Sequence, residues 1–270
     1  MRKFIVPMAM ATASLLSSAA VAQQAAAPAP SPVTGNITLA SEYRFRGIDQ
    51  TAGKPAIQGG FDYSHASGVY LGNWNSNINQ GAGFPGGNIE MDFYGGWKKA
   101  FGDFGLDIGA IYYYYPGSDA SFLGAANPHS TQTNSGNVSN TEFYIGGSWK
   151  FLSAKWFHSL GDYFSIPDTS GTDYFDFAAT YDLGNGWGVL GHVGLLKVKG
   201  YSDLDYTDYK LGVTKDITGW VLGAAYVGTN AKGNCPFDAT TSPYCFSNSI
   251  GQSSRDAGRG TIVLSVGKTF

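Results

Sequence analysis

The chain has 270 residues and a formal net charge of -3, and it combines 15% aromatic residues and 38 glycines with only 14% charged residues. An ordinary soluble domain is about one quarter charged, so this composition is unusual for a soluble enzyme and favours a surface that does not meet bulk water. The negative charge argues against nucleic acid as a partner.

The N-terminal segment has the pattern of a secretory signal peptide. Arg2 and Lys3 precede an apolar run that ends in Ala-Val-Ala, which predicts a signal peptide over residues 1–22, cut between Ala22 and Gln23. Residues 23–34, QQAAAPAPSPVT, lack apolar periodicity and predict a Pro/Ala-rich periplasmic tether. No later segment has eighteen consecutive apolar residues, which excludes a helical membrane span. The folded domain is therefore expected over residues 35–270.

Residues 36–46 alternate with a period of two, as a strand does. Ile37, Leu39, Ser41, Tyr43 and Phe45 share one face, and the other carries Thr38, Ala40, Glu42, Arg44 and Arg46. If the charged face met lipid, each ionised side chain near the midplane would cost about 2 to 4 kcal/mol. We therefore expect Tyr43 and Phe45 to face lipid. Glu42, Arg44 and Arg46 should project into the polar lumen of a closed barrel.

The same alternation recurs along the rest of the chain. It is clearest in residues 88–97, 104–115, 140–149 and 174–182. With 36–46 and the fainter segments, these give about twelve strands, most near the roughly 9 to 11 residues that a tilted strand needs to cross a bilayer. The fainter segments are 55–64, 67–76, 152–160, 187–197, 208–215, 220–229 and 261–270.

The connections between these segments alternate between long and short. The short ones contain turn sequences such as HASG, LGNG and DITG. The long ones are 47–54, 77–87, 116–139, 161–173, 198–207 and 230–260. Long extracellular loops with short periplasmic turns are typical of outer-membrane barrels. The sequence therefore predicts an all-β protein, a closed antiparallel transmembrane β-barrel of about 12 strands, in the outer membrane of a Gram-negative bacterium.

The inward faces of these strands carry the candidate functional residues. Side-chain charges can set ion preference in a narrow pore, and the alternative is that the two arginines pair with acids and hold the barrel closed. Of the tyrosines in 112–115, the outward pair is expected in an interfacial girdle, whereas the inward pair could stack on a sugar-like solute. The predicted lumen-facing residues are Glu42, Arg44, Arg46, Asp62, Glu90, Asp92, Asp107, Tyr113, Tyr115, Glu142, Asp176 and Lys210.

Other motifs predict no catalytic, cofactor or metal site. GAGFPG at 81–86 matches G-x-G-x-x-G, but it lies in a proline-containing loop with no helix pattern after it. The acids in 203–208 are expected in a solvated loop, with a divalent cation or a bridge to lipopolysaccharide as the alternative. Adjacent His158 and Ser159 would point to opposite faces of a strand and could not act as a catalytic pair, so we do not expect an enzyme.

The cysteines and the C-terminus fit an exported barrel. Cys235 and Cys245, the only cysteines, are predicted to form a disulfide that staples a loop. The terminal TIVLSVGKTF alternates apolar residues and ends in Phe270, which resembles the signal read by the barrel-assembly machinery. Lys268 departs from that pattern, since an apolar or aromatic residue is usual there.

Several of these segments resemble one protein family. SEYRFRGIDQT, with its S-x-Y-x-x-R-G motif, and the later IEMDFYGGW, YYYYPG and TEFYIGGSW are similar to exported proteobacterial proteins of the Gcw_chp family, also called TorF family porins. The likeness extends from about Gly35 to Phe270. It implies an outer-membrane porin role and supplies neither a substrate nor site residues.

Together these features predict a narrow channel for passive diffusion of small hydrophilic solutes, with a weak cation preference. Its other partners would be outer-membrane lipid, lipopolysaccharide and, during biogenesis, the barrel-assembly machinery; no cofactor is expected. A non-conducting structural or adhesive barrel is the alternative, and it predicts a lumen full of paired charges. A membrane-embedded lipid hydrolase, the less favoured alternative, would depend on His158 or His192.

Overall fold

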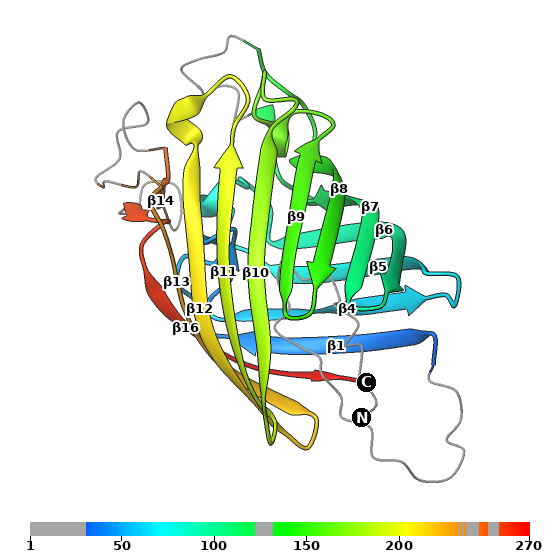
Figure 1. Ribbon diagram of the computed structural model, residues 1–270. Helices are drawn as coiled ribbons and strands as arrows, with labels where there is room; N and C mark the ends of the chain where they lie inside the picture. Colours follow the sequence, from blue (N-terminus) through cyan, green and yellow to red (C-terminus); the bar gives the residue numbers. More distant parts are fainter. Residues whose placement is uncertain (1–30, 122–131, 232, 234, 236–242, 248–253) are drawn as a thin grey trace.

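The protein is a closed antiparallel β-barrel (Figure 1). A computed structural model describes residues 31–270 except 122–131, 232, 234, 236–242 and 248–253. In this part of the chain, neighbouring strands pair in sequence order and β1 closes the ring by pairing with both β4 and β16. The wall strands are β1 (Val33–Ala40), β4 (Ala56–Ser64), β5 (Val69–Asn77), β6 (Ile89–Phe101), β7 (Phe104–Tyr114), β8 (Ser139–Trp149), β9 (Leu152–Ser159), β10 (Asp173–Gly184), β11 (Trp187–Lys197), β12 (Tyr206–Ile217), β13 (Trp220–Thr229) and β16 (Thr261–Thr269).

Long and short connections alternate around the barrel, which confirms the predicted strand number and loop asymmetry. In Figure 1 the β10–β11 and β12–β13 turns lie at the lower end, and η3 and β14 lie at the upper end. No helix among the described residues is long and apolar enough to cross a membrane. The long connections contain β2 (Arg44–Phe45), β3 (Ile48–Asp49), η1 (Gln80–Ala82), η2 (Tyr163–Ser165), η3 (Ser202–Leu204), β14 (Cys245–Ser247) and β15 (Ser254–Asp256).

The short turns follow from their sequences. Asn185 and Gly186 join β10 to β11 with φ values of 52° and 76°. A two-residue hairpin turn with positive φ at both positions matches the twist of the flanking strands, and Asn-Gly adopts it at little cost. The LGNG segment therefore forms the tight turn that its sequence predicts.

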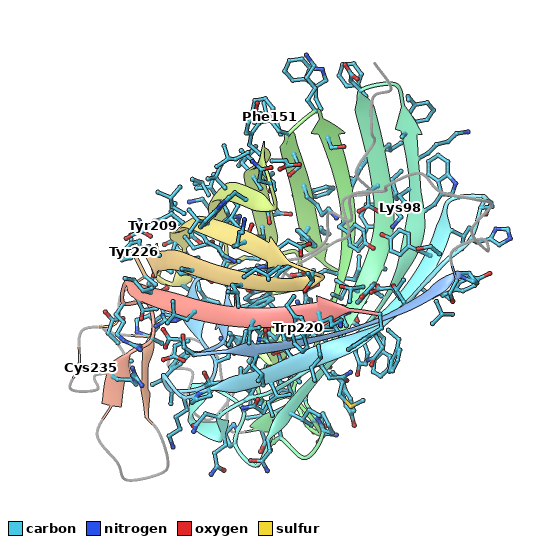
Figure 2. The ribbon with its side chains drawn as sticks, turned by 90° about the horizontal axis from the view of Figure 1, so that it is seen from below. Lys98, Phe151, Tyr209, Trp220, Tyr226 and Cys235 are labelled. Atoms are coloured by element: carbon cyan, nitrogen blue, oxygen red, sulfur yellow. A yellow bond between two sulfur atoms is a disulfide. The ribbon has the colours of Figure 1, made fainter. Side chains whose placement is uncertain are left out.

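The outer face of the barrel is apolar. Phe61, Leu71, Leu211 and Ile262 come from four different strands, and each is more than half exposed. The rings of Tyr209 and Tyr226 lie on the outside of the wall (Figure 2), with their centroids 6.2 Å apart. Exposed apolar surface on this scale is unfavourable in water, but a barrel in lipid requires it because these side chains contact hydrocarbon. Closure of the barrel also leaves no strand edge with unpaired backbone groups. The barrel is therefore built to span a membrane.

Tryptophans paired with lysines mark the short-turn end of this outer face. Lys150 lies 4.6 Å from the Trp149 ring centroid, Lys215 lies 4.9 Å from Trp187, and Lys268 lies 5.1 Å from Trp220. Amphipathic aromatic rings and long cationic side chains are typical of the membrane interface. Lys268, which interrupts the C-terminal pattern, thus occupies an interfacial position beside a tryptophan.

Two predictions concern residues at the chain ends. The signal peptide and most of the tether fall in residues 1–30, outside the described residues, and they stay predictions. At the other end, Phe270 exchanges backbone hydrogen bonds with Gly35 of β1, with N to O distances of 2.8 and 3.2 Å. These bonds fix the last residue at the short-turn end of the wall, while its role as an assembly signal remains a prediction.

Candidate functional site

The connection between β1 and β4, residues 41–55, folds into the barrel, and we call it the plug. It contains the β2–β3 hairpin, whose turn at Arg46 and Gly47 has φ values of 46° and 81°. A Cβ added at Gly47 would lie 2.4 Å from Cγ2 of Thr229 and 2.8 Å from Cβ of Asp208. Because these neighbours belong to β13 and β12, the hairpin tip presses against the barrel wall, and only glycine fits there.

Substituting Gly47 should therefore displace the plug. We expect Gly47→Ala to destabilise the protein by about 1 to 3 kcal/mol, because the new methyl group overlaps the wall. Gly219→Ala is a matched control, since Gly219 also has a positive φ of 85° but an added Cβ there meets nothing within 4 Å. Urea unfolding of both variants in detergent micelles measures the difference. An equal loss at both positions would show that backbone strain alone matters.

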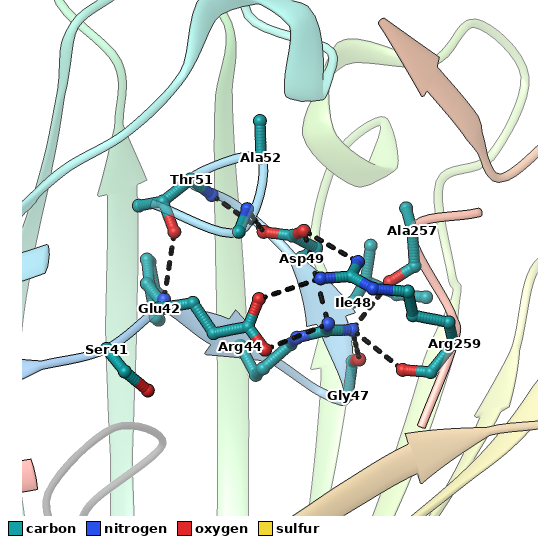
Figure 3. A network of polar contacts seen from close by, with 12 residues as sticks. Ser41, Glu42, Arg44, Gly47, Ile48, Asp49, Thr51, Ala52, Ala257 and Arg259 are labelled. Carbon is teal, nitrogen blue, oxygen red and sulfur yellow. Dashed lines mark hydrogen bonds and ion pairs between the residues drawn. The ribbon is translucent and has the colours of Figure 1, made fainter. Parts of the chain in front are cut away.

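One side of the plug is held by an ion-pair network (Figure 3). The Glu42 carboxylate accepts from Arg44 Nη2 at 3.1 Å and from Arg259 Nη2 at 3.0 Å. Arg259 Nη1 also donates to Asp49 Oδ2 at 3.0 Å, and Arg44 Nη1 donates to the Ala257 carbonyl at 2.9 Å. Arg259 and Ala257 belong to the β13–β16 connection, so two segments far apart in sequence fasten each other inside the barrel.

The same β13–β16 connection carries the predicted disulfide. Cys235 and Cys245 are bonded to each other, which confirms the pairing. Cys245 begins β14, which pairs with β15. In β15, Arg255 Nη1 donates to the carbonyl of Ala52 in the plug. The disulfide thus staples a loop that contacts the plug directly.

The tip of the plug is held by a second, deeply buried ion pair. Arg46 Nη1 and Nη2 donate to Glu142 Oε1 and Oε2 of β8 at 2.9 and 2.7 Å, and both side chains are 2% exposed or less. The guanidinium also lies 4.0 Å from the centroid of the Tyr174 ring. Burial alone would lower the Arg46 pKa, but the Glu142 carboxylate together with the Tyr163 and Tyr113 hydroxyl groups outweighs burial and raises this pKa well above its usual value. Arg46 is therefore charged and fixed in place.

Aromatic contacts complete the plug and correct one prediction. Tyr43 and Phe45, which the alternation placed toward lipid, are buried inside the barrel. Tyr43 OH donates to Glu90 Oε1 at 3.0 Å, and the Phe45 ring packs edge-to-face on Tyr113 at 5.4 Å. The prediction was wrong because β1 ends at Ala40, so the chain leaves the wall before these residues. Glu42, Arg44 and Arg46 do lie in the lumen, but on the plug instead of a wall strand.

Inward side chains pack around the plug on nearly every side. A water-filled lumen would leave such residues accessible, whereas here each strand from β4 to β13 contributes at least one that is buried. These include Gln58, Ser76, Glu90, Tyr113, Glu142, Phe157, Tyr174, Leu196, Tyr206 and Val227. The lumen is therefore filled by protein at this level. Tyr115 is buried as well and stacks on Phe84 at 3.9 Å, so Tyr113 and Tyr115 contact protein and are not positioned to stack on a solute.

Between this packed level and the short-turn end, the inward side chains are charged and partly exposed, and we call this region the vestibule. Lys155 Nζ lies 2.7 Å from Asp107 Oδ2, and Tyr70 OH donates to Asp107 Oδ1 at 2.6 Å. His192 lies between two carboxylates, with Nε2 2.7 Å from Asp208 and Nδ1 3.3 Å from Asp176. In both clusters a base thus lies beside one or two carboxylates.

The vestibule contains both predicted and unpredicted residues. Asp62, Asp107, Asp176 and Lys210 face it as the alternation indicates, and Asp62 accepts a hydrogen bond from Tyr94 at 2.6 Å. Glu90, Asp92 and Glu142 lie deeper, at the packed level. Lys98, Lys155 and His192 also face the vestibule and were absent from the predicted lumen-facing set, although His192 was considered as a residue of a hydrolase. Every second residue of β6 after Glu90 and Asp92 shares their inward face, and this series includes Lys98. In β9, Lys155 lies two residues before Phe157 and therefore on the same face.

The remaining candidates do not assemble into a catalytic or metal site. His158 bonds Asp173 at 2.8 Å on the outer face of the wall, whereas Ser159 lies on the inward face of β9. The acids of 203–208 are divided, because Asp205 pairs with Lys197 at 3.0 Å and Asp208 points inward to His192. Within the described ranges, no group of three or more His, Cys, Asp or Glu side chains is placed to hold a metal ion.

These features define a class of protein: a membrane-spanning β-barrel whose lumen is closed by a plug from its first long connection. The chain belongs to the Gcw_chp family, described as bacterial proteins of unknown function, whose profile matches residues 24–270. A comparison with curated proteins finds no match.

Solved structures with a similar barrel have very different sequences. The KdgM porin is 7% identical over 88% of this chain and 98% of its own, with a TM-score of 0.48. The NanC porin is 10% identical over 88% of this chain and 98% of its own, with a TM-score of 0.46. OmpT of Vibrio cholerae is 9% identical over 88% and 97%, with a TM-score of 0.42. The fold assignment rests on the strand pairing of this chain itself.

Proposed function

We propose that this protein is an outer-membrane channel of porin type that passes small hydrophilic solutes by passive diffusion when the plug leaves the lumen. The observation that carries the proposal is that the wall closes without the plug. Ala40 at the end of β1 pairs directly with Ala56 at the start of β4, so residues 41–55 contribute no strand to the barrel. Twelve strands enclose more space than the eight that wall side chains alone fill, and the plug occupies part of that space.

The charges at the packed level support a weak cation preference in the open state. Arg46 neutralises Glu142, whereas no described base pairs with Glu90 or Asp92, and the vestibule below them carries both signs. A narrow passage with excess carboxylates favours cations. We expect the reversal potential in a KCl gradient to be displaced modestly toward the potassium equilibrium potential. A displacement toward chloride would contradict this assignment.

Planar-bilayer recording of the refolded mature protein tests the channel directly. We expect a closed baseline with brief openings, because the plug is held by several buried ion pairs. Liposomes that contain the protein should swell slowly in small sugars and not at all in large oligosaccharides. Silence in both assays, with and without the plug, would refute the proposal.

A non-conducting structural or adhesive barrel is the second candidate. It is favoured by the paired lumen charges, among them Arg46 with Glu142 and Lys155 with Asp107. The two candidates differ in one outcome, since only the channel should conduct after the plug is removed. We do not propose a lipid hydrolase, because in the described structure the rings of His158 and His192 contact carboxylates and no serine hydroxyl.

A further inference from the structure

Glu90 and Asp92 direct unsatisfied oxygens into the packed lumen. They lie two residues apart on β6, so both side chains point inward, and their exposed fractions are 0% and 3%. Tyr43 OH donates to Glu90 Oε1 at 3.0 Å. In contrast, Glu90 Oε2 and Asp92 Oδ1 are buried without a hydrogen-bond partner.

Positive charge is missing at this place. Both terminal nitrogens of Arg46 are engaged by Glu142, and Arg44 binds Glu42 and backbone carbonyls. Among the described residues, no ion pair links Glu90 or Asp92 to a base. Ionised carboxylates buried without a counter-charge are strongly disfavoured, so a cation or protons must compensate them.

A neutral oxygen lies in the same row of the wall, two strands from Asp92 and beyond the buried Tyr113 of β7. Asp92 pairs with Tyr113 in the β6–β7 register, and Tyr113 pairs with Asn140 in the β7–β8 register. Asn140 is 2% exposed, and its Oδ1 is buried without a partner. Its Nδ2 donates to Glu142 Oε1 at 3.1 Å, which assigns the amide nitrogen to Glu142 and leaves the oxygen unused. Carboxylate and amide oxygens are the ligands that hard cations prefer.

We propose that Glu90, Asp92 and Asn140 form a binding site for one Ca²⁺ ion inside the barrel, next to Tyr43 of the plug. A divalent ion matches the two uncompensated charges, and Ca²⁺ accepts irregular coordination that water or hydroxyl oxygens complete. The absence of nitrogen and sulfur ligands from this set disfavours zinc. The bound ion links β6 to β8 and braces the wall on which the plug rests. This inference does not depend on whether the barrel conducts.

Terbium luminescence tests the site in the refolded full-length mature protein after EDTA treatment. Tb³⁺ substitutes for Ca²⁺ and is sensitised by nearby tyrosines, here Tyr43 and Tyr113. We expect sensitised emission that Ca²⁺ displaces, and a rise in unfolding temperature of about 5 °C at saturating Ca²⁺. The double variant Glu90→Gln/Asp92→Asn should lose both effects. It should stay folded in EDTA, because it keeps the side-chain volume and removes the repelling charges.

Asp103→Asn is the control, because Asp103 is an exposed carboxylate in the β6–β7 turn and its loss should leave both signals unchanged. Tb³⁺ emission that persists in the double variant would place the ion elsewhere and overturn the proposal. The proposal also fails if Ca²⁺ leaves the unfolding temperature of the wild type unchanged while acid raises it, and if acid has no such effect on the double variant. The two carboxyl groups would then hold protons instead of a metal ion. Neither readout involves conductance, so failure of the channel proposal is a separate result.

Discussion

Replacing residues 41–55 with a short Gly/Asn turn should convert a closed barrel into a persistently open channel. Ala40 and Ala56 are paired neighbours, so a turn of about four residues can join β1 to β4 without strain. The deletion removes the side chains that fill the centre of the lumen and leaves every wall ladder intact. We expect the open fraction in planar bilayers to rise from on the order of 1% to nearly complete.

A matched turn exchange separates loss of the plug from loop replacement in general. The β4–β5 turn, residues 65–68, lies at the short-turn end and can take the same Gly/Asn sequence while the plug stays in place. This control should keep the closed baseline of the wild type. A plug-deleted protein that folds, shown by altered mobility on heating in detergent, yet never conducts would favour the non-conducting barrel.

The wall of this barrel could be predicted from the sequence because lipid imposes a simple rule on it. Every second residue of a strand faces hydrocarbon, so Phe175 and Phe177 alternate with Tyr174 and Asp176 in β10. Turn sequences such as Asn185-Gly186 fix where strands end. These signals are local, so the period-two alternation of apolar and polar residues in the sequence is enough to detect the strands.

The plug could not be predicted, because its pattern continues that of β1 without a break. Tyr43 and Phe45 alternate with Glu42 and Arg44 whether the segment lies in the wall or inside the lumen, where its aromatic residues are buried as well. Only tertiary contacts distinguish a strand of the wall from a segment inside the lumen. Glu142 pairs with Arg46 and Arg259 pairs with Glu42, and these partners from distant parts of the sequence hold the charged side chains of the plug inside the lumen. The glycine that ends the S-x-Y-x-x-R-G motif is the one local sign that the strand stops. Gly47 has a positive φ of 81°, and a glycine inside a strand pattern often marks a bend or a close backbone contact.

Breaking the Arg46–Glu142 pair should release the plug while the wall remains folded. Removing one partner of a buried ion pair leaves the other charge uncompensated and costs about 3 to 5 kcal/mol. Arg46 takes no part in the hydrogen bonds between wall strands, so the lost free energy destabilises the inserted position of the plug. The equilibrium between inserted and released plug should shift toward release by roughly a hundred- to a thousand-fold or more. Both Arg46→Met and Glu142→Gln should show the effect.

Cysteine labelling measures the release independently of conduction. Thr51 is buried in the plug, so Thr51→Cys in an otherwise unchanged protein should react slowly with a membrane-impermeant maleimide, and much faster when Arg46→Met or Glu142→Gln is added. No free cysteine in the described chain competes for the reagent.

The double variant Arg46→Met/Glu142→Leu decides whether charge or packing holds the plug. It leaves no buried charge behind, so it should label more slowly than either single variant if the penalty is electrostatic. Lys197→Ala supplies the control. Its partner Asp205 lies 3.0 Å away on an exposed part of the rim, and an exposed pair of this kind contributes at most about 1 kcal/mol. Labelling as fast in the double variant as in Arg46→Met, together with slow labelling of Glu142→Gln, would show that the Arg46 stack on Tyr174 keeps the plug in the lumen and that the pair with Glu142 does not.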